Sequence, residues 1–120
     1  MSKYIVLMKF TSDTASQPSR FGETVDSMKQ AWESLSGQRC EIDLTQGQYD
    51  AVLVGQAGES EMLAFISWVG RENIASTETL TAYDVSTVVN SLHLWSKPTS
   101  VIMSRGPKPF GDAIPPVSQA

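Results

Sequence analysis

Residues 4–10, Tyr4-Ile5-Val6-Leu7-Met8-Lys9-Phe10, form a nearly unbroken apolar run at the start of the 120-residue chain. Their β-branched and aromatic side chains predict a buried strand. Successive strand residues point to opposite faces, so Val6 and Met8 share one face while Leu7 lies on the other. A sheet with one solvated face alternates apolar with polar residues, and this run does not. The sequence therefore predicts a strand that is covered on both faces.

The residues after this strand predict a loop over 11–18 and then a helix. The helix is predicted by one apolar stripe, with steps of four, three, four and three, formed by Phe21, Val25, Met28, Trp32 and Leu35. Ser19 is the expected N-cap of this helix. Gly37 is expected to end it in the left-handed conformation.

Two further strands, 40–45 and 49–56, are predicted on either side of Gln46-Gly47-Gln48, a short glycine-centred hairpin connection. A second helix follows, with an apolar stripe of Met62, Phe65, Ile66 and Val69. The threonine-rich run 74–83 favours a fourth strand. Asp84 is expected to cap a short third helix, whose apolar side is formed by Val85, Val88, Val89 and Leu92.

The order strand, helix, strand, strand, helix, strand predicts an α+β fold of the ferredoxin-like βαββαβ kind, with a four-stranded antiparallel sheet. An extra helix and an extended tail follow. We expect one domain over residues 1–97 and a proline-rich tail over 98–120, which holds five of the six prolines. No internal repeat is visible.

The second face of this sheet needs a cover, because two helices cover only one face. In the third strand, Leu53 points to one face while Val52 and Val54 point to the other. Isologous two-fold dimers are the commonest assemblies, so the simplest cover is the same sheet of a second copy. The expected partner is therefore the chain itself, as a homodimer or a higher homo-oligomer.

Composition excludes several other partners. The net charge is −4, and the basic residues are scattered without a stripe that would neutralise phosphates, so no nucleic-acid binding is expected. The first apolar run is too short for a signal peptide core or a membrane span. The lone cysteine, Cys40, is expected to be buried and inert, and it suits a reducing compartment. We expect a soluble, cytoplasmic protein with no membrane contact.

Three short motifs resemble the GYD-domain family, which is named for a Gly-x-Tyr-Asp signature before the third strand. The signature stands here as Gly47-Gln48-Tyr49-Asp50, and the runs 4–11 and 77–80 are similar to the family's first and fourth strands. The resemblance covers about residues 3–93. It implies a dimeric α/β barrel, in which two ferredoxin-like sheets face each other, and it implies no assigned activity. The chain departs from the family in its proline-rich tail and in having only Ser36-Gly37 after the first helix, where two glycines are usual.

Within this signature, Asp50 and Tyr49 are candidate ligand-binding residues. The Asp50 carboxylate suits a base or a ligand-orienting group, but we favour a role in satisfying backbone N–H groups of the turn. The Tyr49 hydroxyl can donate to a ligand in a barrel cavity, but packing of its ring with the hydroxyl at the rim is the commoner arrangement.

Glu78 is a candidate acid or base because acidic residues are disfavoured inside strands. Two interpretations stand: in a dimer cavity its carboxylate would be desolvated and its pKa raised, whereas on a solvated edge it only discourages aggregation. Lys9 is a candidate to pair with it across the sheet, or a surface residue. His93, the only histidine, is a candidate general base or haem ligand. We favour a structural role for it, as a partly exposed histidine. With one histidine and one cysteine, a structural zinc site is not expected.

Three functional hypotheses follow, and no cofactor is expected from any motif. The first is a dimer that binds or transforms a small hydrophobic organic molecule in an inter-sheet cavity, by proton transfer or oxygenation. It assigns catalysis to Glu78 and His93, and ligand binding to Tyr49, Asp50, Lys9 and Trp68. Trp68 lies off its helix's apolar stripe, whereas Trp32 is expected in the core. The second is a non-catalytic interaction module with a filled core, and the third is haem binding through His93.

Overall fold

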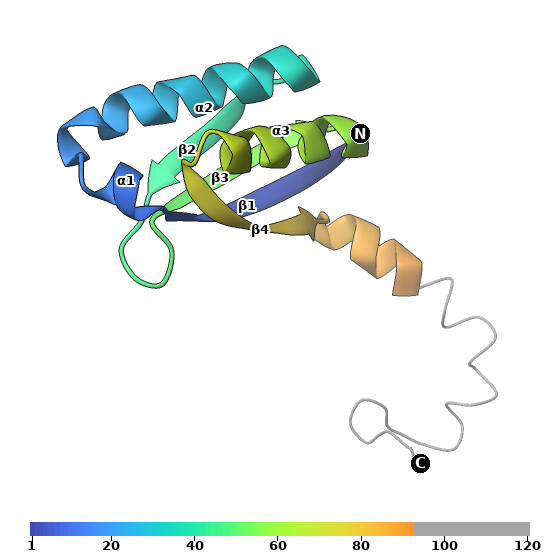
Figure 1. Cartoon of the computed structure of the whole chain (residues 1–120). Coiled ribbons are helices and arrows are strands. Elements are labelled where there is room, and N and C mark those ends of the chain that lie inside the picture. The colour runs from blue at the N-terminus through green and yellow to red at the C-terminus, as the bar shows by residue number, and fades with distance from the viewer. Residues whose placement is uncertain (93–120) are drawn as a thin grey trace. The chain divides into compact units, whose positions relative to one another are not determined.

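The apolar run at the start of the chain is strand β1, Ser2–Phe10, in a computed structural model that describes residues 1–92. It is one of two central strands in a four-stranded antiparallel sheet of order β2-β3-β1-β4. The other strands are β2 (Cys40–Leu44), β3 (Ala51–Ala57) and β4 (Ala75–Ala82). Helices α2 and α3 lie on one face of this sheet (Figure 1). The ferredoxin-like α+β fold predicted from the sequence is confirmed.

Helix α2, Phe21–Ser36, buries the middle of its apolar stripe against the sheet, where Met28 and Trp32 are almost fully inaccessible. Leu35, which was predicted in the same stripe, is 40% exposed. Gly37 ends the helix with φ 71° in the left-handed region, as the sequence predicts, and its N–H donates to the Glu33 carbonyl at 2.9 Å. Helix α3, Glu59–Arg71, begins with two glutamates, which suit the positive end of the helix dipole.

The predicted loop over 11–18 and the predicted cap at Ser19 are wrong. The segment contains a short helix α1, Ser12–Ala15, and a 3-10 turn η1, Pro18–Arg20, which leads directly into α2. Thr11 caps α1 because its side chain accepts from the Thr14 N–H. Ser19 lies inside η1, and α2 has no side-chain cap.

The core lies between the sheet and the two helices. Trp32 of α2 packs edge-on against Phe65 of α3, with ring centroids 5.1 Å apart. Its indole N–H donates to the Gln56 carbonyl of β3 at 3.2 Å. The Trp32 ring packs so close to β3 that position 55 has no space for a side chain. A Cβ added at Gly55 would lie 2.7 Å from the Trp32 Nε1.

The connection between β2 and β3 is longer than the predicted hairpin, since it spans residues 45–50 and includes Tyr49 and Asp50, which were expected in the strand. Two hydrogen bonds close this loop: the Thr45 N–H donates to the Asp50 carbonyl at 2.8 Å, and the Thr45 hydroxyl donates to the Tyr49 carbonyl at 2.7 Å. Gly47, with φ 132°, supplies the bend. The loop projects below the sheet, away from α2 and α3 (Figure 1).

The first compact unit ends at Ala82, and a second unit begins at Tyr83. Within the second unit, residues 85–92 form the predicted helix, which starts with the Val88 N–H on the Asp84 carbonyl at 3.2 Å. The expected domain boundary at residue 97 and the proline-rich tail lie outside the described residues. Among the helices of residues 1–92, none is long and apolar enough to span a membrane.

Candidate functional site

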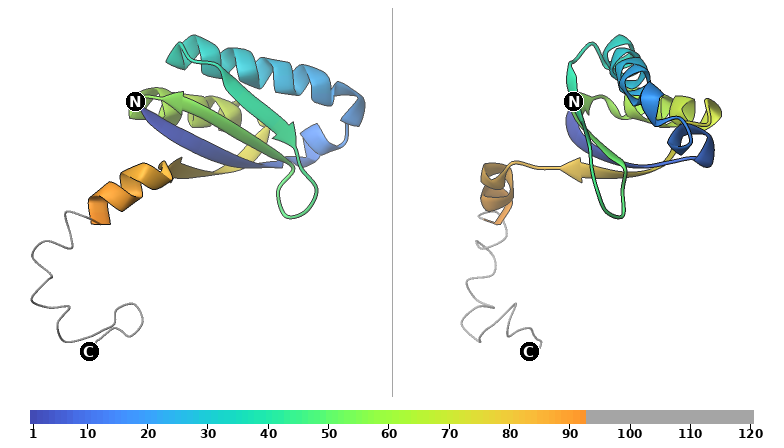
Figure 2. Two further views of the ribbon diagram at one scale, coloured as in Figure 1. Left: turned by 180° about the vertical axis from the view of Figure 1, so that it is seen from behind. Right: turned by 90° about the vertical axis from the view of Figure 1, so that its left-hand side faces the viewer.

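The open face is the face of the sheet opposite α2 and α3, visible edge-on in Figure 2. The strand register lines up its apolar side chains, because Ile5 pairs with Val54 on one side and with Leu80 on the other. Leu7 pairs with Val52 in the next row. The open-face strip is therefore Ile5, Leu7, Val52, Val54 and Leu80. Leu80 is 43% exposed and the other four are half-buried, so the two-sided apolar character predicted for β1 and β3 is present in the fold.

A polar pair adjoins this strip. Glu78 of β4 lies opposite Leu7 on the open face, and the Tyr49 hydroxyl from the β2–β3 loop donates to its Oε1. Both residues were sequence candidates, and the fold brings them together across 29 positions. The hydrogen bond to Glu78, followed by desolvation, raises the pKa of Tyr49 above its ordinary value. Tyr49 therefore stays a protonated donor, and the carboxylate keeps further lone pairs for another partner.

Asp50 does not lie with this pair. Its Oδ2 accepts from the Phe10 N–H at the end of β1, at 2.8 Å, and its own N–H donates to the Met8 carbonyl at 2.8 Å. The carboxylate accepts from a backbone N–H group, as we favoured from the sequence. That group is the N–H of Phe10 in β1, however, and not an N–H of the turn. Asp50 thus fixes the loop that carries Tyr49 to the first strand.

Charges of both signs frame the open-face strip. Lys3 and Lys9 lie at the two ends of β1 and share the face of Ile5 and Leu7, since they are an even number of residues away. Glu41 and Asp43 of β2 lie opposite Val54 and Val52. Lys9 pairs in register with Ser76, which is two residues from Glu78 on β4. Among residues 1–92, the single side-chain ion pair within 4 Å joins Arg20 and Glu23. Of the two alternatives for Lys9, the pair with Glu78 is not formed within one chain, and Lys9 is an exposed surface residue.

The other candidates lie elsewhere. Trp68 is on α3, where its ring packs on Phe65 with centroids 6.1 Å apart, so it belongs to the helical layer and not to the open face. Cys40 is buried as expected, and burial together with the nearby Glu33 raises its pKa to about 11. His93 lies outside the described residues. Within those residues, no three His, Cys, Asp or Glu side chains are grouped to hold a metal ion.

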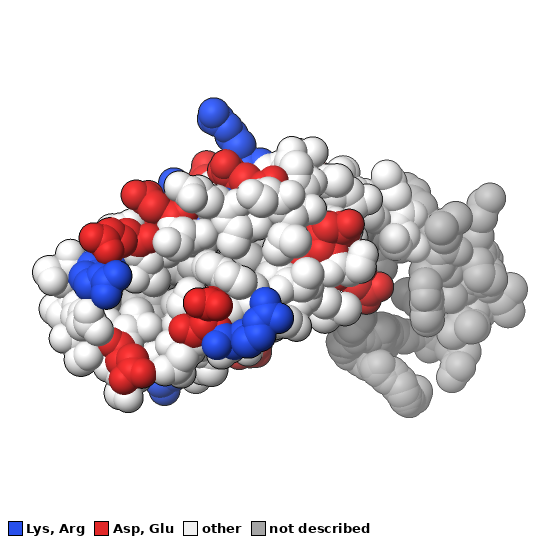
Figure 3. Space-filling model, turned by 45° about the horizontal axis from the view of Figure 1, so that its top comes forward, with Lys and Arg blue, Asp and Glu red and all other residues white. Residues whose placement is uncertain are grey.

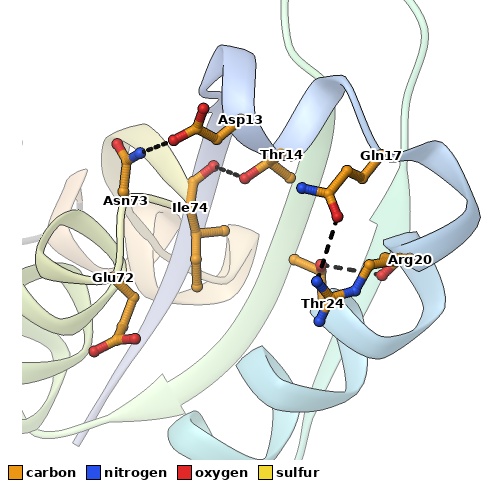
Figure 4. A pocket seen from close by; sticks show the side chains of 8 residues that line it. All are labelled: Asp13, Thr14, Gln17, Arg20, Thr24, Glu72, Asn73 and Ile74. Atoms are coloured by element: carbon orange, nitrogen blue, oxygen red, sulfur yellow. Dashed lines mark hydrogen bonds between the residues drawn. The ribbon is translucent and has the colours of Figure 1, made fainter.

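One feature that the sequence did not indicate is a polar hollow of about 280 Å³ beside α1 (Figure 4). It is lined by Asp13, Thr14, Gln17, Arg20, Thr24, Glu72, Asn73 and Ile74. The Asn73 amide donates to Asp13 at 2.7 Å, and the Thr14 hydroxyl donates to the Ile74 carbonyl at 2.8 Å. These bonds tie α1 to the α3–β4 turn, so the hollow is a seam between two segments whose polar groups largely satisfy one another. No local pattern predicts it, because its partners are about 60 residues apart in the chain.

The fold and the open face define a small ferredoxin-like α+β domain with a half-exposed apolar sheet face. The side of the molecule seen in Figure 3 carries acidic and basic side chains scattered without a stripe of one sign. No family model matches the chain, and no curated protein matches it significantly. The chain is similar to the crystal structure of TTHA0845 from Thermus thermophilus, with 23% identity, a TM-score of 0.46, and coverage of 71% of this chain and 96% of that chain.

Proposed function

We propose that two copies of the protein pair through their open faces, as a dimeric α/β barrel of the GYD-domain kind. In this proposal a small, mainly apolar organic molecule binds between the sheets, beside Tyr49 and Glu78. The observation that carries the proposal is the open-face strip itself, an apolar surface that adjoins a hydrogen-bonded tyrosine and glutamate. Ligand sites are usually apolar with a few convergent polar groups.

A second copy fits the open face better than a partner of one charge sign does. The face carries lysines at the ends of β1 and acidic residues on β2 and β4. A two-fold axis through the strip can set Lys3 or Lys9 of one copy against Glu41, Asp43 or Glu78 of the other. Isologous pairing of this kind needs a surface that is complementary to itself, and mixed charge around an apolar centre meets that need.

In this proposal the Glu78 carboxylate acts on the ligand. The Tyr49 hydroxyl holds that carboxylate in place through its hydrogen bond. Covering the open face with a second sheet removes water from both side chains, which strengthens a hydrogen bond from a ligand hydroxyl to the carboxylate. The reaction class that this pair supports is proton transfer, with Glu78 as base. The buried free thiol of Cys40 suits a reducing compartment, and we propose the cytoplasm.

Ligand binding is tested by thermal shift with a panel of small aromatic molecules, with and without a hydroxyl group. Wild type should be stabilised by hydroxylated members, and Glu78→Gln should weaken their binding about tenfold or more, as expected for losing a hydrogen bond to a charged group. Glu59→Gln is the matched control, because Glu59 is exposed at the start of α3, on the opposite side of the sheet from the open face. An equal response of the two variants, or no stabilisation by any ligand, would refute the ligand proposal.

A second candidate, an interaction module whose inter-sheet space is filled by side chains, is favoured by one observation. Tyr49 and Glu78 already satisfy each other, so they need no ligand to be hydrogen-bonded. The module predicts a dimer that no panel member stabilises and in which Glu78→Gln changes only the stability of the fold. The thermal-shift panel and a sedimentation measurement of the mass together separate the two candidates.

A further inference from the structure

We propose that the helix over residues 85–92 is a second self-association surface, which packs against the same helix of another copy. The contact is built by Val85, Val88, Val89 and Leu92, whose exposed fractions are 79%, 48%, 43% and 60%. Their spacing of i, i+3, i+4 and i+7 places them in one stripe along the helix, the pattern of a helix–helix seam. This inference goes beyond the proposed function and concerns a different surface of the chain.

The helix cannot owe its stability to its own sequence. Its described part is residues 85–92, and most helical stability in proteins comes from packing of an apolar face rather than from intrinsic propensity. Four of its residues, Val85, Thr87, Val88 and Val89, are β-branched, which lowers helix propensity further. Among the described residues 1–92, the one side-chain hydrogen bond made by this helix joins the Ser91 hydroxyl to the Thr87 carbonyl at 3.0 Å. A helix of this composition needs packing of its apolar stripe.

Charge points to a second copy as the partner. Residues 1–82 contain six Lys or Arg and eleven Asp or Glu, a net charge of −5, so two such units repel each other weakly. Residues 85–92, Val-Ser-Thr-Val-Val-Asn-Ser-Leu, contain no charged side chain at all. Interface cores are depleted in charged residues, and this stripe has no charged side chain of its own, although Asp84 adjoins it at the start of the helix. This segment is therefore where two acidic chains can approach most favourably.

The size of the open face gives a further reason, which rests on the proposed sheet contact. Four strands about 4.8 Å apart and about seven residues long span roughly 19 Å by 23 Å, or roughly 440 Å² of flat area. A standard interface buries ~800 Å² of accessible surface on each partner. Accessible surface exceeds flat area because side chains give it relief, so the sheet contact is of modest size. A second contact through the helix stripe would add to it.

The test is disulfide trapping in the full chain under mild oxidation, with a cysteine placed on the stripe or opposite it. Val89→Cys lies near the middle of the stripe, where a residue meets its own copy in a parallel or an antiparallel pair. Thr87→Cys is the matched control, since position 87 is about 160° around the helix from position 89. Cys40 can stay in place, because it is buried.

Val89→Cys should form the covalent dimer at least about tenfold faster than Thr87→Cys, because the packed helices hold the two thiols at high effective concentration. The double variant Val88→Glu/Val89→Glu should also lower the sedimenting mass or weaken association. Equal trapping rates for the two cysteines, or no trapped dimer, would overturn the proposal. Another segment, and not a second copy of this helix, would then pack against the stripe. Failure of the sheet contact is measured separately, from the mass of Leu80→Lys, which leaves the stripe intact.

Discussion

Replacing Gly55 with alanine is expected to destabilise the fold by about 1.5–4.5 kcal/mol, because the added methyl group has no space in the core. Gly55 lies on β3 between Tyr4 and Cys40 in register, on the face that packs against α2. An added Cβ would lie 2.7 Å from the Trp32 Nε1 and 2.9 Å from the Cys40 Cβ, closer than real Cβ contacts come.

The expected magnitude has two parts. Overpacking of a filled core costs ~1–3 kcal/mol. Moving the Trp32 ring also breaks its hydrogen bond to the Gln56 carbonyl, which contributes ~0.5–1.5 kcal/mol. Because Trp32 is also in edge contact with Phe65 of α3, its displacement disturbs both helices. Chemical denaturation followed by tryptophan fluorescence measures the change as a shift in the midpoint at constant slope.

Gly70→Ala is the control for this substitution. Gly70 lies in α3 with no atom within 4 Å of an added Cβ, so alanine should stabilise the helix by ~0.4–1 kcal/mol. The reasoning is refuted if Gly55→Ala is as stable as wild type, or if the two alanine variants change stability in the same direction.

Three further outcomes are expected. The pKa of Tyr49 should exceed that of a free tyrosine, so its hydrogen bond to Glu78 stabilises the fold at neutral pH and is lost as the pH rises through the raised value. In a tyrosinate absorbance titration, Tyr49→Phe identifies the signal of Tyr49, and Glu78→Gln should lower the pKa of that signal. An unchanged titration in Glu78→Gln would contradict the pair. The Cys40 thiol, with its pKa raised to about 11, should react with a thiol reagent far more slowly in the native than in the unfolded protein near neutral pH, and equal rates would contradict its burial. Asp50→Ala should cost about 1.5–3 kcal/mol in thermal unfolding because it leaves the Phe10 N–H without its acceptor, and a neutral effect would show that this bond is dispensable.

Periodicity was sufficient to predict the sheet and the two main helices. The run 4–10 became β1, one of the two central strands, and the stripe containing Met28 and Trp32 became the buried side of α2. These predictions are confirmed because burial on one or two faces imposes a spacing that the sequence displays directly. The role of Gly37 was equally predictable, since a left-handed helix end favours glycine.

The prediction for the segment 11–20 was wrong because its structure depends on contacts made far along the chain. Thr11 donates to the Asn73 carbonyl at 2.8 Å, and this long-range bond supports a one-turn helix that polar composition alone does not indicate. Ser19 is a good cap by residue type, yet Pro18 starts a 3-10 turn that places Ser19 inside a helical run.

The candidate site was predictable in its residues and not in its geometry. Tyr49 was expected in a strand, but it lies in the β2–β3 loop, which lets its hydroxyl reach Glu78 on β4. That meeting depends on the crossover that places β4 beside β1, which no local pattern encodes. Trp68 was grouped with the site because it lies off the apolar stripe of its helix, and the side of the sheet on which that helix packs separates it from Tyr49.

Sedimentation equilibrium over a concentration series tests the central claim, that the open face is where two copies meet. Wild type should sediment at twice the 13.1 kDa chain mass or more. Leu80→Lys places a charge on the open-face strip at a residue that is 43% exposed in the single chain, so it should shift the protein toward one chain mass without unfolding it. Leu63→Lys, at a residue 54% exposed on α3, should leave the mass unchanged. A wild-type protein that stays at one chain mass throughout, or equal masses for the two lysine variants, would contradict the account.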